Sequence, residues 1–175
     1  MFAANSTPVF RLTFVCTGNI CRSPMAEAIT AQLARERGLV RDLEITSSGT
    51  GEWHVGEKAD PRTRAALKRA GYSAERHRAK QFDPAKFDTY DLIVTFDRGQ
   101  RRILRAWAET DAQRTLIKPL YLFDPLAKGP AEVPDPYYGD DELFDRVLVI
   151  IERACKMLLT QIEPAVRAAR GESAR

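Results

Sequence analysis

The chain is poor in the residues that build disulfide scaffolds, zinc sites and membrane spans. Its 175 residues contain three cysteines and two histidines, with no zinc-like spacing among them. So few cysteines, odd in number, exclude a disulfide framework and favour a reducing compartment. The longest aliphatic run, Val147 to Ile151, is far too short to cross a bilayer. No basic start with an apolar stretch opens the chain, so we expect a cytoplasmic protein without a secretory signal or membrane attachment.

The excess of positive over negative charge is small, since the net charge is +3, but the two signs are segregated along the chain. Residues 58–105 carry 13 Lys or Arg against 6 Asp or Glu, and residues 106–145 carry 3 against 9. A basic region of this kind suits an anionic partner. It lacks the interleaved aromatic residues that stack on bases, so we expect no nucleic acid.

Strand-like and helix-like segments alternate along the chain, which predicts an α/β fold. Hydrophobic residues make up 44% of the sequence, enough for the core of one domain. Ser23-Pro24 and Asp60-Pro61 read as an N-cap followed by proline, and Gly38 and Gly71 as the ends of these two helices. Two further helices are expected, one near 98–109 and one amphipathic helix carrying Leu143, Val147, Ile150, Ile151, Ala154 and Leu158 on one face. Strands are expected at 9–15, 43–48, 91–96 and 115–123.

This order of elements predicts a single doubly wound domain. Helical crossovers between strands imply a four-stranded parallel sheet with helices on both faces. We place the domain at 8–163, with loose tails at 1–7 and 164–175. The connection 124–140 holds four prolines and two glycines and is long enough to suggest a function of its own.

The segment from Cys16 to Ser23 follows the first strand, where ligands bind in open α/β sheets. Five residues separate Cys16 from Arg22, enough for a loop to curl around one tetrahedral anion with its N–H groups pointing inward. Gly18 and Asn19 tolerate the backbone angles such a ring needs. Arg22 can bind two anion oxygens at once, and the same groups would stabilise a Cys16 thiolate aimed at phosphorus.

Other readings of these residues are weaker. A buried structural cysteine beside a surface arginine would not require the strand before the loop or the helix start after it. No Gly-Lys-Ser or Gly-Lys-Thr occurs, so a nucleotide loop of that type is absent. Gly49-Thr50-Gly51 lacks the third glycine of a dinucleotide-binding motif.

A thiolate that displaces an alkoxide or phenoxide needs a proton donor for the leaving oxygen. His54 and His77 are candidates by residue type. Asp135 is the better candidate by position, because it lies in the Pro-rich loop beside Tyr137 and Tyr138. An Asp-Pro turn without chemistry is the plain alternative.

Residues 15–28, Val-Cys-Thr-Gly-Asn-Ile-Cys-Arg-Ser-Pro-Met-Ala-Glu-Ala, resemble the active-site segment of low-molecular-weight protein tyrosine phosphatases. Further segments match in the right order: Ser48-Gly49, Trp53-His54-Val55-Gly56, Asp60-Pro61-Arg62, Asp97 and Asp135-Pro136-Tyr137-Tyr138-Gly139. The resemblance spans about residues 9–160 and implies the same four-stranded fold. It implies hydrolysis of phosphotyrosine and small aryl phosphates, without metal or cofactor.

The resemblance also implies roles for individual residues. Cys16 would be the nucleophile that forms a phosphocysteine, and Arg22 would bind the phosphoryl oxygens. Asp135 would protonate the leaving phenol and then activate water. The loop residues that contact substrate would be Thr17, Gly18, Asn19, Ile20, Cys21 and Ser23.

Supporting roles follow from the same resemblance. Asn19 would hold the loop partly by bonding Ser48, and Ser23 would donate to the Cys16 sulfur. Trp53 and Tyr137 would wall the slot for the phosphotyrosine ring, although Trp53 taken alone could be a partly buried core aromatic. His77 and Glu27 would form a structural pair behind the loop.

Three alternatives stay open at this point. Arginine phosphatases of this fold carry threonine where this chain has Ile20, and lack the double tyrosine. Arsenate reductases need two further cysteines, and only Cys155 is available downstream. A binding module would keep the anion loop without Asp135.

The expected partner is a phosphotyrosine-containing protein, with a tyrosine kinase as one candidate, and the expected state is a monomer or weak dimer. Arg98, Arg101, Arg102 and Arg105 could steer acidic phosphopeptides, or form a solvated helix face. Cys21 lies in the loop with Cys16 and could capture an oxidised Cys16 as a disulfide, or pack the loop without redox chemistry.

Overall fold

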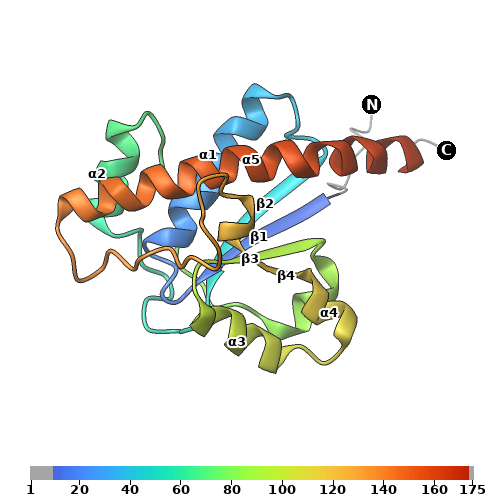
Figure 1. Ribbon diagram of the computed structural model, residues 1–175, viewed down its shortest axis with the longest axis horizontal. Helices are drawn as coiled ribbons and strands as arrows, with labels where there is room; N and C mark the ends of the chain where they lie inside the picture. The colour runs from blue at the N-terminus through green and yellow to red at the C-terminus, as the bar shows by residue number, and fades with distance from the viewer. Residues whose placement is uncertain (1–9, 174–175) are drawn as a thin grey trace.

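Four parallel strands form the sheet of the computed structural model, which describes residues 10–173 (Figure 1). They are β1 (Phe10–Cys16), β2 (Leu43–Gly49), β3 (Leu92–Thr95) and β4 (Ile117–Pro119), in the order β2-β1-β3-β4. Because all four are parallel, their carboxyl ends meet at one edge of the sheet. The order reverses beside β1, so the loop after β1 opens at the crevice where ligands bind in such folds.

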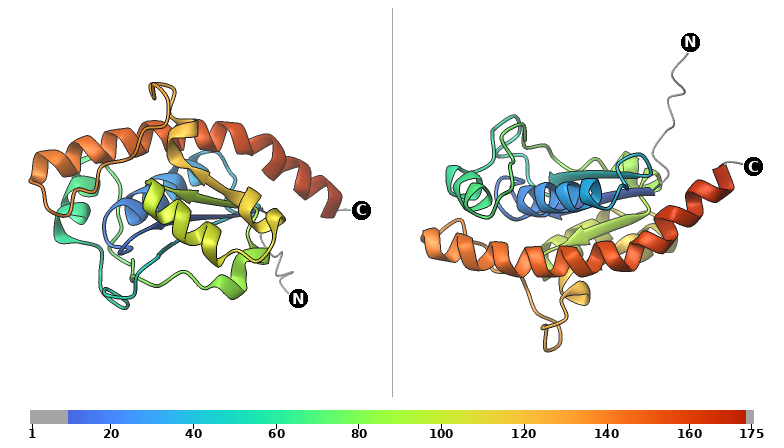
Figure 2. Two further views of the ribbon diagram at one scale, coloured as in Figure 1. Left: turned by 60° about the horizontal axis from the view of Figure 1, so that its bottom comes forward. Right: turned by 90° about the horizontal axis from the view of Figure 1, so that it is seen from above.

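Helices cover both faces of the sheet, as the alternation predicts. Figure 1 shows α1 (Arg22–Glu36), α2 (Pro61–Arg69) and α5 (Asp141–Ser173) on one side. On the other side lie α3 (Arg98–Trp107) and α4 (Asp111–Leu116). The two short 3₁₀ helices are η1 (Pro84–Thr89) and η2 (Leu120–Phe123). Helix α5 runs the length of the molecule and packs against α1 (Figure 2). None of the helices between residues 10 and 173 is long and apolar enough to span a bilayer.

Side chains of the two central strands, β1 and β3, point alternately into two separate apolar clusters. Leu12 and Phe14 of β1 join Val94 of β3 in the cluster beneath α1 and α5. Val15 and Ile93 point the other way, into a cluster with Leu104 of α3. Successive strand residues face opposite sides of a sheet, so a strand buried on both faces must be apolar almost throughout.

The Asp60-Pro61 signal at the start of α2 and the glycine signals after α1 and α2 are confirmed. The Asp60 side chain accepts the Arg62 N–H at 2.8 Å, and Pro61 occupies the first helical position of α2. Gly38 and Gly71 have φ values of 70° and 86°. This left-handed region is unfavourable for any residue that carries a Cβ atom, so glycine is preferred there. Beyond α1, the N–H of Leu39 returns to the Ala34 carbonyl at 2.8 Å, so the last turn keeps its hydrogen bonds.

Two expectations about the elements are wrong. The strand predicted at 115–123 shrinks to Ile117–Pro119, between α4 and η2. Helix α1 begins at Arg22, with Cys21 at the N-cap position, because the Ser23 hydroxyl is engaged in the loop instead of capping the helix.

The expected tail at 164–175 is helical up to Ser173. Helix α5 continues through Pro164 because Ile162 and Val166 are buried in the core and Arg37, the residue that follows α1, donates to Glu163 at 3.3 Å. These tertiary contacts outweigh the loss of one backbone hydrogen bond at the proline. Residues 1–7, the other expected tail, lie outside the described residues.

Candidate active site

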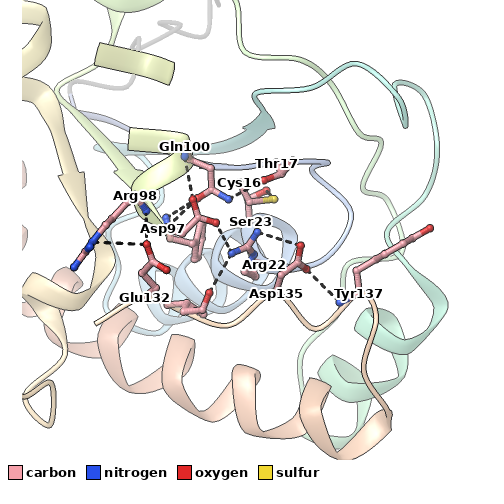
Figure 3. Close-up of polar contacts among 12 residues, drawn as sticks. Cys16, Thr17, Arg22, Ser23, Asp97, Arg98, Gln100, Glu132, Asp135 and Tyr137 are labelled. Atoms are coloured by element: carbon pink, nitrogen blue, oxygen red, sulfur yellow. Dashed lines mark hydrogen bonds and ion pairs between the residues drawn. The ribbon is translucent and has the colours of Figure 1, made fainter. Parts of the chain in front are cut away.

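Cys16 is the last residue of β1, and the loop that follows it curls back to the first turn of α1 at Arg22 (Figure 3). Asn19, within this loop, has a φ of 55°, a left-handed conformation that asparagine adopts more readily than most residues. The N–H groups of Thr50 and Gly51 hold the carbonyls of Cys16 and Thr17, each at 2.9 Å. A Cβ on Gly49 would lie 2.5 Å from the Thr17 carbonyl oxygen, so only glycine permits this approach.

The Cys16 sulfur lies in a small polar environment. Its side chain is buried, and Sγ is 2.9 Å from the Ser23 hydroxyl oxygen. The Asn19 N–H donates to Sγ at 3.3 Å. Ser23 therefore contacts Cys16 as the resemblance implies.

Asn19 connects the loop to three other segments. Its side-chain nitrogen donates to Ser23 at 2.8 Å and to Ser47 at 2.9 Å, and its side-chain oxygen accepts the Lys80 N–H at 3.0 Å. Its carbonyl oxygen lies 2.7 Å from His77 Nε2. The loop shape is thus held by hydrogen bonds to side chains and backbone around it.

Glu27 and His77 lie behind the loop, as expected. The Ser47 hydroxyl donates to Glu27, and His77 Nδ1 lies 3.8 Å from the same carboxylate oxygen. Both side chains reach Asn19, Glu27 through Ser47 and His77 directly.

The serine that bonds the Asn19 side chain is Ser47, so the expected bond to Ser48 is wrong. Ser47 pairs with Phe14 across the sheet and shares its face, on the side of α1. Ser48 pairs with Val15 and faces the opposite side. Its carbonyl still accepts from Ser23 at 3.4 Å.

Arg22 is a buried guanidinium with three oxygen contacts (Figure 3). Nη1 donates to Asp97 at 2.9 Å and to the Val133 carbonyl at 3.1 Å, and Nη2 lies 3.4 Å from an Asp135 carboxylate oxygen. A buried charge is costly unless it is paired in this way. These contacts hold the planar group beside the loop, where it can bind two oxygens of an anion.

Asp97 belongs to a capping box at the start of α3. Its Oδ1 accepts the Gln100 N–H at 3.0 Å, while Gln100 Oε1 accepts the N–H groups of Phe96 and Asp97 at 2.9 and 3.1 Å. Gln100 Nε2 also donates to the Thr17 hydroxyl at 3.1 Å. Our reading of the sequence missed Gln100, although the spacing Asp-x-x-Gln is a known helix-start signal.

Asp135 is fixed by the loop that carries it. Its Oδ1 accepts the Tyr137 N–H at 3.2 Å, and its side chain is 46% exposed. Arg62 of α2 donates to the carbonyls of Tyr137 and Gly139 at 3.0 and 3.1 Å, which ties this loop to the domain. The guanidinium is itself oriented by Asp60 and lies 4.5 Å from the Phe144 ring centroid.

Asp60 must be ionised to orient Arg62 in this way. Burial alone would raise the pKa of Asp60, but hydrogen bonds from Arg62 outweigh burial and lower it. The sequence predicted only a helix cap for Asp60 and gave Arg62 no role, although Asp60-Pro61-Arg62 is one of the segments that resemble the family.

A cavity of about 430 Å³ opens above the loop. Its walls are Cys16, Thr17, Gly18, Ile20, Cys21, Arg22, Trp53, His54, Asp135, Tyr137 and Tyr138. Every catalytic residue and most substrate contacts expected from the sequence therefore meet in one place.

The rim of the cavity is aromatic. Trp53 is 71% exposed, so the alternative of a core aromatic is wrong. A Cβ on Gly51 would come within 1.8 Å of the Trp53 ring, so glycine at 51 lets the indole fold over the rim. His54, which sequence reasoning set aside, lies 6.2 Å from the Tyr137 ring, and Tyr138 stands edge-on to Tyr137 at 4.9 Å. The rim suits a flat aromatic group.

All three cysteines are free and buried. Burial raises the pKa of the Cys21 thiol to about 12, so Cys21 stays protonated at neutral pH. Cys155 lies in the core beside α1. Among residues 10–173, no three His, Cys, Asp or Glu side chains gather in a way that could hold a metal ion.

Comparison with known proteins gives one consistent match. The family model described as low molecular weight phosphotyrosine protein phosphatase matches residues 11–168. A low molecular weight protein-tyrosine-phosphatase of Streptomyces coelicolor is 44% identical over 158 residues, covering 90% of this chain and 96% of that protein.

Solved structures give the same fold. A protein tyrosine phosphatase from Entamoeba histolytica superposes with a TM-score of 0.84 at 33% identity, covering 89% of this chain and 98% of that one. An arginine phosphatase, YwlE of Bacillus subtilis, superposes with a TM-score of 0.77 at 23% identity, over 88% of this chain and 96% of that one. At that identity the likeness to YwlE concerns the fold alone.

Proposed function

The chain belongs to the low molecular weight phosphotyrosine protein phosphatase family, and from this premise we propose that Cys16, Arg22 and Asp135 carry out its reaction. The enzyme is a protein tyrosine phosphatase. One observation carries the assignment of residues. A nucleophilic sulfur, a buried guanidinium and a carboxyl group line one cavity, with the carboxyl oxygen 3.4 Å from the guanidinium.

In the first step the Cys16 thiolate attacks phosphorus and the bond to the aryl oxygen breaks. The proton of the Asp135 carboxyl group passes to the leaving oxygen, so a neutral phenol departs. Arg22 and the loop N–H groups hold the phosphoryl oxygens while charge develops on them. Ser23, 2.9 Å from the sulfur, stabilises the thiolate before attack and when it leaves again.

In the second step water attacks the phosphocysteine, and Asp135, now a carboxylate, accepts a proton from that water. The S–P bond breaks, which releases inorganic phosphate and returns the thiolate. Asp135 is 46% exposed, so water can reach it from the cavity mouth. Each proton and electron pair is therefore accounted for by three side chains and one water molecule.

The rim supports phosphotyrosine as the substrate group. Trp53 and Tyr137 form walls that suit a flat phenyl ring between them and the loop. Ile20 contributes an apolar side chain to the same cavity, which disfavours the polar guanidino group of phosphoarginine. We therefore propose phosphotyrosine proteins as partners, a tyrosine kinase among them. The three free cysteines support a separate proposal, that the compartment is the reducing cytoplasm.

The test is turnover of phosphotyrosine peptide, p-nitrophenyl phosphate and phosphoarginine by the wild-type enzyme at equal concentration. We expect kcat/KM for the two aryl phosphates to exceed that for phosphoarginine by at least about tenfold, because an apolar wall in place of a polar contact costs about 1–3 kcal/mol. Equal rates on phosphoarginine would overturn the assignment of the substrate and leave the nucleophile intact.

We also propose that Cys21 protects Cys16 from irreversible oxidation. Peroxide oxidises the Cys16 thiolate to a sulfenic acid, and the Cys21 thiol then displaces water to give a Cys16–Cys21 disulfide. Both side chains line the same cavity, and the raised pKa of Cys21 directs peroxide to Cys16 first. Cys21 supplies a second thiol without competing for the oxidant.

After peroxide treatment and reduction, wild type is expected to recover most of its activity and Cys21→Ser little of it. Mass spectrometry should find the bridge in wild type, and Cys155→Ser, which alters a cysteine remote from the cavity, should behave as wild type. Equal recovery of wild type and Cys21→Ser, or no bridge, would contradict the proposal.

A further inference from the structure

Both polar atoms of the Gln100 side chain form hydrogen bonds. The side chain is buried, at 1% exposure, and it lies between the end of β3, the start of α3 and the loop after β1 (Figure 3). Oε1 accepts two N–H groups, from Phe96 at 2.9 Å and from Asp97 at 3.1 Å. Nε2 donates to Thr17 Oγ1 at 3.1 Å.

The amide at this position does more than cap a helix. A glutamate at the third helical position can accept the same N–H groups, and its charge would favour the helix N-terminus. It could only accept a hydrogen bond from the Thr17 hydroxyl, and its charge would lie beside a loop that binds an anion. The donating nitrogen of glutamine is therefore what distinguishes it from an ordinary capping residue.

Gln100 also connects the two parts of the site that hold a phosphoryl group. Its backbone N–H donates to Asp97 Oδ1 at 3.0 Å, and Asp97 Oδ2 accepts a hydrogen bond from Arg22 at 2.9 Å. Its side chain fixes Thr17, the first loop residue after Cys16. Movement of Gln100 would thus displace the guanidinium and the loop N–H groups relative to each other.

We propose that Gln100 is a positioning residue for phosphoryl binding, which it controls through Thr17 and through Asp97. The proposal rests on the proposed function, because it assumes that Arg22 and the loop bind the phosphoryl group. It concerns binding geometry, so its direct measure is the affinity for inorganic phosphate.

The experiment compares Gln100→Glu, Thr17→Val and the double variant with wild type. The inhibition constant of inorganic phosphate, kcat/KM for p-nitrophenyl phosphate and the melting temperature are measured for each. Thr17→Val removes the hydroxyl that accepts this bond and Gln100→Glu removes the N–H that donates it. Each single variant is expected to weaken phosphate binding on the order of fivefold, the worth of one neutral hydrogen bond. In Gln100→Glu the new carboxylate also repels phosphate, and this repulsion persists when Thr17 is changed to Val. The loss of phosphate affinity in the double variant is therefore compared with the sum of the two single losses. The amount by which it falls short of that sum measures the positioning effect.

Gln113→Glu is the matched control. Gln113 is also buried at the third position of a helix, α4, and its side chain accepts the Glu109 N–H at 2.8 Å and donates to Asp88 at 3.0 Å. We expect a lower melting temperature, because two carboxylates would face each other, and an unchanged inhibition constant for phosphate.

Wild-type turnover separates failure of this proposal from failure of the proposed function. If wild type is active and Gln100→Glu changes only the melting temperature, Gln100 is structural and the proposal is wrong. Fully additive losses in the double variant overturn the link through Thr17. If Gln100→Glu does not fold, Thr17→Val breaks the same bond from the loop side, and an unchanged phosphate affinity in that variant overturns the proposal equally.

Discussion

Cys16→Ser is expected to fold like wild type and to lose turnover on the order of 10⁴- to 10⁶-fold, the usual loss when a nucleophile is removed. A serine hydroxyl is protonated at neutral pH and attacks phosphorus far more slowly than a thiolate. The loop shape does not depend on the sulfur, because Asn19 and its partners Ser23, Ser47 and Lys80 hold it. In the variant, the serine hydroxyl oxygen can accept the hydrogen bond from the Asn19 N–H that Cys16 Sγ accepts in wild type.

The loss must therefore appear in kcat while phosphate binding persists. Measurement of p-nitrophenyl phosphate turnover, the phosphate dissociation constant and the melting temperature separates the two. Cys155→Ser is the control, since that thiol lies in the apolar core beside α1 and should cost stability without affecting the chemistry. A Cys16→Ser enzyme with activity near that of wild type would refute the phosphocysteine mechanism.

The parts of the fold and site that could be predicted depend on neighbours in the sequence. Asp60-Pro61 and Gly38 act within one turn of their helices, so their signals hold in the structure. Cys16 and Arg22 are six residues apart in one loop, so their proximity follows from local spacing, although partners outside the loop hold its shape. Asp135 was a candidate from its place in the Pro-rich loop beside two tyrosines, and the loop after β4 carries it to the same cavity.

The parts that could not be predicted depend on register and on distant contacts. Ser47 and Ser48 are equivalent in the sequence, and only the pairing of β2 with β1 decides which hydroxyl faces Asn19. The run 115–123 is apolar enough for a strand, but periodicity does not reveal where a short strand gives way to a 3₁₀ helix. Gln100 and Thr17 are 83 residues apart, so a capping signal alone does not indicate the loop it reaches.

Asp135→Ala is expected to slow esters of poor leaving groups far more than esters of good ones. The phenol of tyrosine has a pKa of about 10, so it departs slowly as an anion and needs the proton that Asp135 supplies. General acid catalysis of this kind increases the rate by about 10²–10⁴-fold. The nitro group of p-nitrophenyl phosphate stabilises the departing anion, so most of that gain is not needed there. The ratio of wild-type to variant kcat should therefore be much larger for phosphotyrosine than for p-nitrophenyl phosphate.

Asp140→Ala is the matched control for this experiment. Asp140 lies five residues from Asp135, and its carboxylate accepts the Leu143 N–H at 2.9 Å at the start of α5. Loss of such a cap costs about 1 kcal/mol of stability and should slow all esters alike, if at all. The Asp135 carboxylate also pairs with Arg22 at 3.4 Å, so its removal could change phosphate affinity as well. That change would be the same for every ester, because the phosphoryl group is common to all of them. Only the dependence on the leaving group identifies the acid, and a uniform loss in Asp135→Ala would assign proton donation to another residue of the cavity.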